Sequence, residues 1–294
     1  MQLLVYILIY PILWILSILP FPVFYLFSDF VCFLTYNIIG YRKKVVRDNM
    51  KLALPHLTDK ERLIIEKKFY SHMCDMFLEM IKTITISQEE IEKRFTFSNM
   101  EVYYELEKKN KSIALMCAHY ASYEWVISMN YYIHHKGFGI YKKLANPYFD
   151  KLVKRIRSKF KAELITTKET IPTILENHRK QLLGLYGFAS DQSPKRNAAY
   201  HWTNFMGHIV PVHTGAEMLA KRFDMNVIFL RVKKLKRGYY EASFEILSEN
   251  AKLVPNYEIT NQFLKLVEEQ IHEAPEFYLW THKRWKHIKE KETV

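Results

Sequence analysis

The segment that decides the fold is residues 112–124, SIALMCAHYASYE, in which five apolar residues, 113–117, lead into polar residues that include His119. A short apolar run without charges is typical of a strand that is buried on both faces of a parallel sheet. Ligands of open α/β sheets bind at the carboxyl ends of such strands. The segment therefore predicts a central strand that brings His119 and Glu124 to a functional site.

Further short apolar runs alternate with helical stretches along the rest of the chain. This alternation predicts an α/β domain with a mostly parallel or mixed central sheet flanked by helices. A basic stretch that ends at Gly238 is typical of a hairpin loop, which predicts an antiparallel pair at one edge. Strands are expected over residues 112–117, 139–144, 163–165, 182–188, 209–213, 227–232 and 239–246, and helices over 121–134, 147–160, 169–180, 214–222 and 258–272.

Residues 42–94 precede this alternation and show apolar residues at helical spacing, with a break at Pro55. Thr58 and Glu61 have the spacing of a capping box, which predicts that a second helix begins there. The broad apolar face of residues 61–84 is expected to pack on the domain, and a helix in the membrane interface is the alternative.

The N-terminus contains two long apolar runs. Residues 3–19 carry no charge, Pro20 and Pro22 interrupt the pattern, and residues 23–39 carry a single charge, Asp29. A membrane-spanning helix needs about 20 apolar residues. The two runs therefore fit one tilted span followed by an interfacial helix, or a helical hairpin. A cleavable signal peptide is disfavoured, because the flanking residues lack its pattern, and a buried helix pair of a soluble enzyme is the remaining alternative.

A positive cluster, residues 42–44 with Arg47 close behind, follows the apolar runs. Positive charge next to a membrane segment favours the cytoplasmic side. We therefore expect residues 1–40 to form a membrane anchor, and residues 41–294 to form a domain on the cytoplasmic face.

The chain has 294 residues and a formal net charge of +12, which favours an anionic partner such as nucleic acid, lipid headgroups or an acidic carrier protein. Its three cysteines, Cys32, Cys74 and Cys117, have neither disulfide-framework nor zinc spacing, which favours a reducing compartment and no metal. The sequence contains no phosphate-binding or dinucleotide-binding glycine motif and no G-x-S-x-G elbow. We therefore expect no cofactor, and nucleic-acid binding is disfavoured because no known binding motif is present.

His119 and Glu124 could form a base–carboxylate pair. A carboxylate fixes the histidine tautomer and stabilises the imidazolium, and the pair can then deprotonate an alcohol. Residues five apart on one helix are separated by about 140° of rotation. His119 is therefore expected in the loop and Glu124 on the first helical turn. A structural loop histidine is the alternative, and Cys117 is a less favoured candidate nucleophile.

Two other segments could carry chemistry. Asp191 and Gln192 follow the strand that ends at Phe188, where an acidic residue could bind a substrate group, lock a loop or cap a helix. Residues 280–287 interleave basic and aromatic side chains near the C-terminus. Such a segment could contact phosphates, a membrane interface or single-stranded nucleic acid, and a solvated tail is the alternative.

Taken in order, these motifs resemble those of the late acyltransferases of lipid A biosynthesis, the lauroyl/myristoyl transferase family of the lysophospholipid acyltransferase-like group. The resemblance covers nearly the whole chain. Besides the His119/Glu124 pair, the matching segments are YRKKVVRDNM (41–50), ALP (53–55), YK (141–142), NP (146–147), DQ (191–192), FMG (205–207), HTG (213–215) and YLWTHKRW (278–285).

The resemblance implies direct acyl transfer, without a cofactor, from a thioester of acyl carrier protein to a hydroxyl of a phosphorylated lipid A precursor or related glycolipid at a bacterial inner membrane. It implies that His119, oriented by Glu124, is the base, and Lys142 is a candidate to stabilise the oxyanion. The implied substrate-binding residues are Lys142, Asn146, Asp191, Gln192, Gly207, Thr214, His282 and Arg284.

The chain departs from the family pattern at a few positions. Lys142 and Lys283 stand where arginine is common, and residues 193–196 lack an acidic residue that is often present after the Asp-Gln pair. Lysine loses the bidentate geometry of arginine. The acceptor therefore stays open between a lipid A precursor and another membrane lipid, such as an aminolipid or a lysophospholipid. A further alternative is that the protein is not an enzyme but a catalytically inactive, membrane-associated lipid-binding protein.

Overall fold

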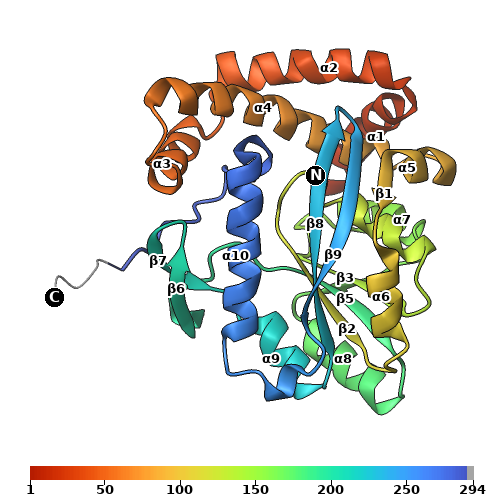
Figure 1. Cartoon of the computed structure of the whole chain (residues 1–294). Helices are drawn as coiled ribbons and strands as arrows, with labels where there is room; N and C mark the ends of the chain where they lie inside the picture. Colours follow the sequence, from red (N-terminus) through yellow and green to blue (C-terminus); the bar gives the residue numbers. More distant parts are fainter. Residues whose placement is uncertain (290–294) are drawn as a thin grey trace.

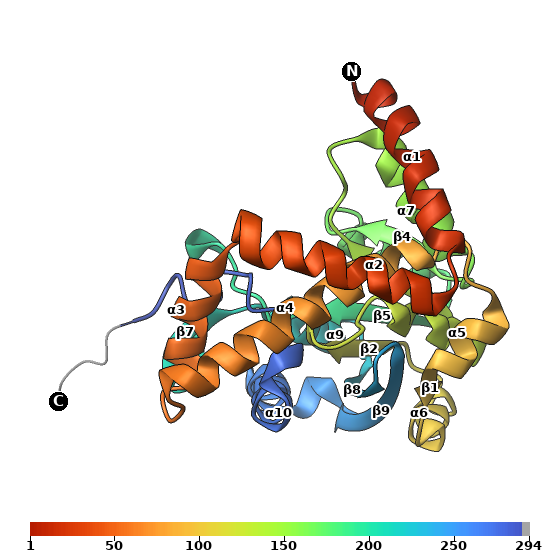
Figure 2. The ribbon, with the colours of Figure 1, turned by 90° about the horizontal axis from the view of Figure 1, so that it is seen from above.

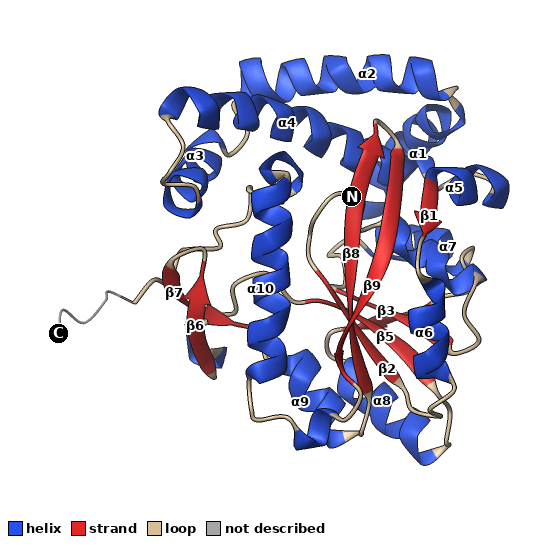
Figure 3. Ribbon diagram, in the orientation of Figure 1, coloured by secondary structure: helices blue, strands red, loops and turns tan. Residues whose placement is uncertain are grey.

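A computed structural model describes residues 1–289 and shows a central sheet flanked by helices, with an apolar helical pair along one side (Figure 1, Figure 3). The predicted α/β class is confirmed. The seven strands of the main sheet follow the order β1 (Phe95–Phe97), β9 (Tyr239–Ser248), β8 (Asn226–Lys236), β2 (Ile113–Cys117), β5 (Gly184–Ala189), β3 (Lys136–Tyr141) and β4 (Glu163–Thr166).

Strand β2 lies in the middle of this sheet, as its apolar run predicts. All five of its residues are buried, and it pairs in parallel with β5 on one side and β8 on the other. The pairing of β8 with β9 is antiparallel and turns at Gly238, as the hairpin prediction requires. This pair is internal, because β1 adds in parallel beyond β9.

Helices pack around the sheet, and the helices from the N-terminal part of the chain lie beyond one end of it (Figure 1). Pro55 separates the first two helices of the predicted 42–94 region. The capping box is confirmed, because Thr58 Oγ1 accepts from Glu61 N at 3.3 Å while Glu61 Oε2 accepts from Thr58 N at 2.7 Å. The α-helices that follow the N-terminal pair are α3 (Lys43–Ala53), α4 (Asp59–Lys82), α5 (Gln88–Arg94), α6 (Met100–Glu107), α7 (Pro147–Ser158), α8 (Thr170–Arg179), α9 (Gly215–Arg222) and α10 (Glu258–Glu273).

The stretch 121–134 differs from its prediction as a helix. It begins irregularly and then forms the 3-10 helix η2 (Trp125–Tyr131). Ala121 has a left-handed φ of 49°, which an α-helix does not contain. Its backbone N–H donates to Phe277 O at 2.9 Å. Pairing with the distant C-terminal segment therefore replaces the first helical turn.

Residues 209–213 also differ from prediction, because they do not join the main sheet. They form most of β7 (His208–Val212), which pairs with β6 (His201–Phe205) in a separate antiparallel hairpin. The turn between them is Met206–Gly207, with φ of 51° and 81°. Two consecutive positive φ angles are the signature of a type I′ hairpin turn, which favours glycine at the second position.

The N-terminal runs form α1 (Gln2–Ile18) and α2 (Phe21–Phe33), and α2 continues into the π-helical segment η1 (Leu34–Ile39). Helix α2 lies alongside α4 (Figure 1, Figure 2). By length and composition the segment Phe21–Ile39 could cross a membrane, whereas α1 is shorter. An apolar helical N-terminus is therefore present as predicted, and the last five residues of the predicted 41–294 domain lie outside the described residues.

Candidate active site

His119 and Asp191 meet at the carboxyl edge of the sheet. His119 follows β2 and Asp191 follows the neighbouring strand β5. His119 Nδ1 lies 2.7 Å from Asp191 Oδ1, and the backbone N–H of His119 donates to the same oxygen at 3.0 Å. Asp191 is 1% exposed. The sequence left Asp191 as a candidate to bind substrate, lock a loop or cap a helix, and the structure instead shows it in contact with His119.

Each residue of this pair stabilises the charged form of the other. Burial lowers the pKa of His119, but the charge and hydrogen bond of Asp191 outweigh it, so the pKa lies above its usual value. Burial raises the pKa of Asp191, but the charge and hydrogen bonds of His119 outweigh it, so that pKa is lowered. An ionised Asp191 that accepts from Nδ1–H leaves Nε2 of His119 as the acceptor for a substrate proton.

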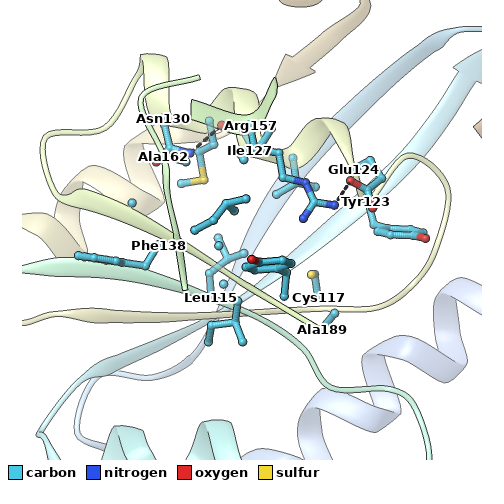
Figure 4. Close-up of a pocket in the computed structure, with 18 of the residues that line it drawn as sticks. Leu115, Cys117, Tyr123, Glu124, Ile127, Asn130, Phe138, Arg157, Ala162 and Ala189 are labelled. Carbon is cyan, nitrogen blue, oxygen red and sulfur yellow. Dashed lines mark hydrogen bonds and ion pairs between the residues drawn. The ribbon is translucent and has the colours of Figure 1, made fainter. Parts of the chain in front are cut away.

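Glu124 does not orient His119 as predicted. Its Oε2 accepts a hydrogen bond from Arg157 Nη2 at 2.6 Å (Figure 4). Two features account for this: Asp191, which is distant in the sequence, occupies Nδ1 of His119, and the loop before η2 is irregular rather than helical. Glu124 remains close enough for its charge to raise the pKa of His119, although less than Asp191 does.

An apolar pocket of about 450 Å³ opens beside these two pairs. Glu124 and Arg157 belong to its wall (Figure 4), and so does His119. Pockets of this size that are mainly apolar with a few polar groups are typical of small-molecule sites. The apolar wall comes from β2, η2, β3, α7, β4 and β5 and includes Leu115, Ile127, Phe138, Val153, Leu164 and Leu185.

Lys142 is the only predicted substrate-binding residue among those that line this pocket. Asn146 instead caps α7, because its Oδ1 accepts from Tyr148 N at 3.0 Å. Its Nδ2 donates to Gln2 O at 3.1 Å, so it also joins α7 to the N-terminus. These contacts account for Asn146 without a substrate.

The remaining candidates lie outside the pocket wall. Gln192 is partly exposed next to Asp191. Gly207 is explained by the β6–β7 turn, and Thr214 is buried at the N-cap position of α9. None of these three residues belongs to the pocket wall, whereas His282 and Arg284 lie close enough to Asp191 for their charges to interact.

The C-terminal aromatic and basic segment is not a solvated tail. Trp280 and Trp285 are buried at 0% and 5% exposure, so they are not free to bind nucleic acid or lipid. His282 Nε2 accepts from Ser193 N at 3.3 Å, and burial lowers the pKa of His282 to about 4. Arg284 is 1% exposed and donates to a backbone carbonyl. The segment therefore supports the loop that carries Asp191.

Thiol chemistry finds little support at this site. Cys117 belongs to the pocket wall, but burial raises its pKa to about 12, which leaves it a weak nucleophile. Among residues 1–289, no cluster of three histidine, cysteine or acidic side chains could hold a metal ion.

Arg157 is a site residue that the sequence did not reveal. It lies on α7 within a run of basic residues, which are usually solvated on such a helix. Its contact with Glu124 depends on how α7 packs beside η2, and local sequence carries no signal for that.

A histidine paired with a buried carboxylate at the wall of an apolar pocket is an arrangement that can act as a general base toward a bound substrate. The model of the bacterial lipid A biosynthesis acyltransferase family matches residues 1–287, so the chain belongs to this family and is an acyltransferase. It is similar to the lipid A biosynthesis lauroyltransferase of Escherichia coli (strain K12), with 22% identity over 276 residues, or 94% of this chain and 89% of the relative. The predicted membership of this family is confirmed.

Proposed function

We propose that this acyltransferase moves a fatty acyl chain from a thioester of acyl carrier protein to a hydroxyl of a lipid A precursor or a related glycolipid. The observation that carries the proposal is the His119–Asp191 pair at an apolar pocket of about 450 Å³. The pair supplies a base for a hydroxyl, and the pocket suits a hydrocarbon chain.

His119 Nε2 takes the hydroxyl proton as the acceptor oxygen attacks the thioester carbonyl carbon. The new C–O bond forms a tetrahedral intermediate, and its collapse breaks the C–S bond. The imidazolium then returns the proton to the departing thiolate. Asp191 stabilises the imidazolium through the Nδ1 contact at 2.7 Å. Transfer is direct and leaves no acyl group on the enzyme.

The oxyanion of the intermediate needs a positive or hydrogen-bonding partner. Arg157 and Lys142 are the two cationic residues in the pocket wall. Glu124 holds Arg157 through a bond of 2.6 Å, which restricts the guanidinium before substrate binds. We therefore assign oxyanion stabilisation to Arg157, with Lys142 as a second cation and Glu124 as the residue that positions Arg157.

The net charge of +12 suits an acidic carrier protein, a phosphorylated acceptor and anionic lipid, so these are the partners we propose. All three cysteines are unpaired. Unpaired thiols fit a reducing compartment. We place the enzyme at the cytoplasmic face of a bacterial inner membrane.

The test uses full-length protein in detergent with radiolabelled thioesters of acyl carrier protein of several chain lengths and a phosphorylated lipid A precursor. We expect transfer by the wild type and its loss in His119→Ala, with circular dichroism showing that the variant is folded. Transfer to a different membrane lipid would correct the acceptor and keep the reaction class. Absence of transfer to every acceptor by folded wild type would overturn the proposal.

A further inference from the structure

We propose that α1 and α2 lie flat in one leaflet of an anionic lipid bilayer and that neither helix crosses it. Both helices are apolar, and Phe21–Ile39 is long enough to span. Their contacts with the rest of the protein nevertheless leave only one side free. This inference makes the membrane location of the proposed function specific, but it does not depend on the acyl donor or acceptor.

Both ends of α1 are attached to the catalytic domain. At its start, Gln2 O accepts from Asn146 Nδ2 at 3.1 Å. At its end, Ser17 is buried, and its carbonyl accepts from Lys82 Nζ at 2.7 Å and from Thr85 Oγ1 at 2.6 Å. A helix that crosses a bilayer places its two ends on opposite sides. A domain on one side could not hold both ends.

The same contacts argue against a helical hairpin. In a hairpin, the turn between α1 and α2 would reach the far side of the membrane. That turn follows Ser17, and Lys82 holds it against the end of α4. Helix α1 has 17 residues, or about 25 Å, which is shorter than a hydrocarbon core of about 30 Å.

One face of α2 carries polar side chains that bond to α4. Tyr25 Oη donates to Glu79 at 2.8 Å, and Ser28 Oγ donates to Asp75 at 2.7 Å. The spacing of three residues puts both side chains on one side of the helix. Glu79 and Asp75 are each 1% exposed, so α2 covers them. Removing α2 into a membrane would break both bonds and expose these carboxylates, which would keep only their partners on the β8–β9 hairpin, including Tyr240 for Glu79 and Arg237 for Asp75.

The second apolar run carries one charged residue, Asp29, and an ion pair explains its presence. Asp29 pairs with Arg237 at 2.6 Å, and Arg237 also pairs with Asp75 at 2.7 Å. Arg237 lies in the turn between β8 and β9, so this network joins α2 to α4 and to the sheet. In a spanning helix, Asp29 would lie at membrane depth, where an ionised side chain is costly.

The opposite faces of both helices are apolar and exposed. In α2, the exposed fractions are 49% for Val23, 70% for Leu26, 56% for Phe30 and 54% for Phe33. In α1, they are 60% for Leu4, 63% for Leu8, 58% for Ile12 and 53% for Ile15. The spacing of three and four residues places each set in a single stripe along its helix.

Charge and position identify lipid as the occupant of this surface. Residues 42–44 are basic and begin three residues after the end of η1, and the Lys44 side chain is 87% exposed. Lys43 Nζ lies 3.7 Å above the Tyr36 ring, an arrangement suited to the headgroup region. Helix α1 also contacts α7, which contributes Val153 to the pocket wall. Helix α1 therefore adjoins a helix that lines the pocket proposed to bind the acyl chain.

Spin-label depth measurements test this arrangement without any turnover. The parent carries Cys32→Ser, because Cys32 is the only one of the three cysteines that is not buried. Leu26→Cys, Phe30→Cys and Phe33→Cys are labelled separately and bound to phosphatidylethanolamine–phosphatidylglycerol vesicles. Leu253→Cys, 84% exposed in η4 (Ala251–Leu253) and beside α9 rather than α2, is the matched control.

We expect the three α2 labels to have the same shallow depth and the Leu253 label to stay in water. A spanning α2 would instead separate the labels at 26 and 33 by about 10 Å in depth, at 1.5 Å per residue. That result would overturn the proposal. So would labels that stay in water, or labels that broaden one another through contact between two copies of the chain.

A second arm tests the charge contribution. Lys43→Gln and Lys44→Gln are each expected to weaken binding to the anionic vesicles roughly fivefold. Neither change should weaken binding to phosphatidylcholine vesicles. Equal binding of wild type and both variants to anionic vesicles would contradict the anionic part of the proposal. If depth is as expected while acyl transfer fails, the membrane inference stands and the proposed function falls.

Discussion

Replacement of Asp191 by Asn tests which carboxylate serves the catalytic histidine. The change keeps the side-chain shape but removes the negative charge that contacts His119 Nδ1 at 2.7 Å. A hydrogen bond to a charged group contributes about 1.5–3 kcal/mol, and the imidazolium of the transition state loses it. We expect kcat to fall roughly 10- to 150-fold. KM should change little, because Asp191 is buried outside the pocket wall.

The pH dependence gives an independent readout of the same change. His119 accepts a proton only when it is neutral, so activity falls as the pH drops through its pKa. Asp191 raises this pKa. Asp191→Asn should therefore lower it and move the acid limb of kcat/KM to lower pH, while the maximal rate falls.

Glu124→Gln is the matched control for this experiment. Glu124 raises the pKa of His119 less than Asp191 does, and its carboxylate is bonded to Arg157. We expect a smaller shift of the acid limb than in Asp191→Asn. Initial rates of transfer from labelled acyl carrier protein, measured on both sides of neutrality, give both quantities. The reasoning is refuted if Asp191→Asn leaves both the rate and the acid limb unchanged, or if Glu124→Gln moves the acid limb further than Asp191→Asn does.

Three further changes test the oxyanion partner, the pocket and the fold. Arg157→Lys keeps the charge but loses the guanidinium geometry, so kcat should fall, approaching the roughly 10²–10³-fold cost of losing one oxyanion donor. An unchanged kcat in steady-state assays would remove Arg157 from this role. Gly139→Ala places a Cβ 2.9 Å from Leu164 Cδ2 in the pocket wall, so competition between labelled thioesters should favour shorter chains than in the wild type. An unaltered preference would mean that the chain does not reach this wall. Thr58→Ala removes the cap of α4 that Glu61 completes and should lower the free energy of unfolding by about 1 kcal/mol in urea, and equal stability would contradict the capping role.

The central strand and the α4 capping box were predictable because their signals are local. The apolar run 113–117 forms β2 within one residue of its prediction, and Thr58 caps the helix that its spacing with Glu61 predicts. In both cases burial or hydrogen bonding within a few residues determines the structure.

The partner of His119 was not predictable in the same way. Asp191 reaches it because β5 lies beside β2, and strand order is a property of the whole sheet. From the sequence, Glu124 was predicted as the partner of His119 because it lies only five residues further along the chain. The same limit applies to Arg157, whose contact with Glu124 needs the packing of α7 against η2.

Elements that depend on distant contacts were predicted least well. The helix expected from residue 121 is replaced because Ala121 bonds to Phe277. The three-residue strand β1 and helix α6 were not predicted, since their apolar patterns are short. The polar stripe of α2 is similarly invisible in the sequence, where Asp29 looks like one charge in an apolar run.

The most direct test of the central claim is single-turnover acyl transfer by wild type and by His119→Ala, with both proteins shown to be folded. If His119 is the base, transfer to the hydroxyl acceptor should fall by roughly 10²–10⁴-fold in the variant. A variant that transfers acyl groups at the wild-type rate would contradict the claim that the His119–Asp191 pair carries the reaction.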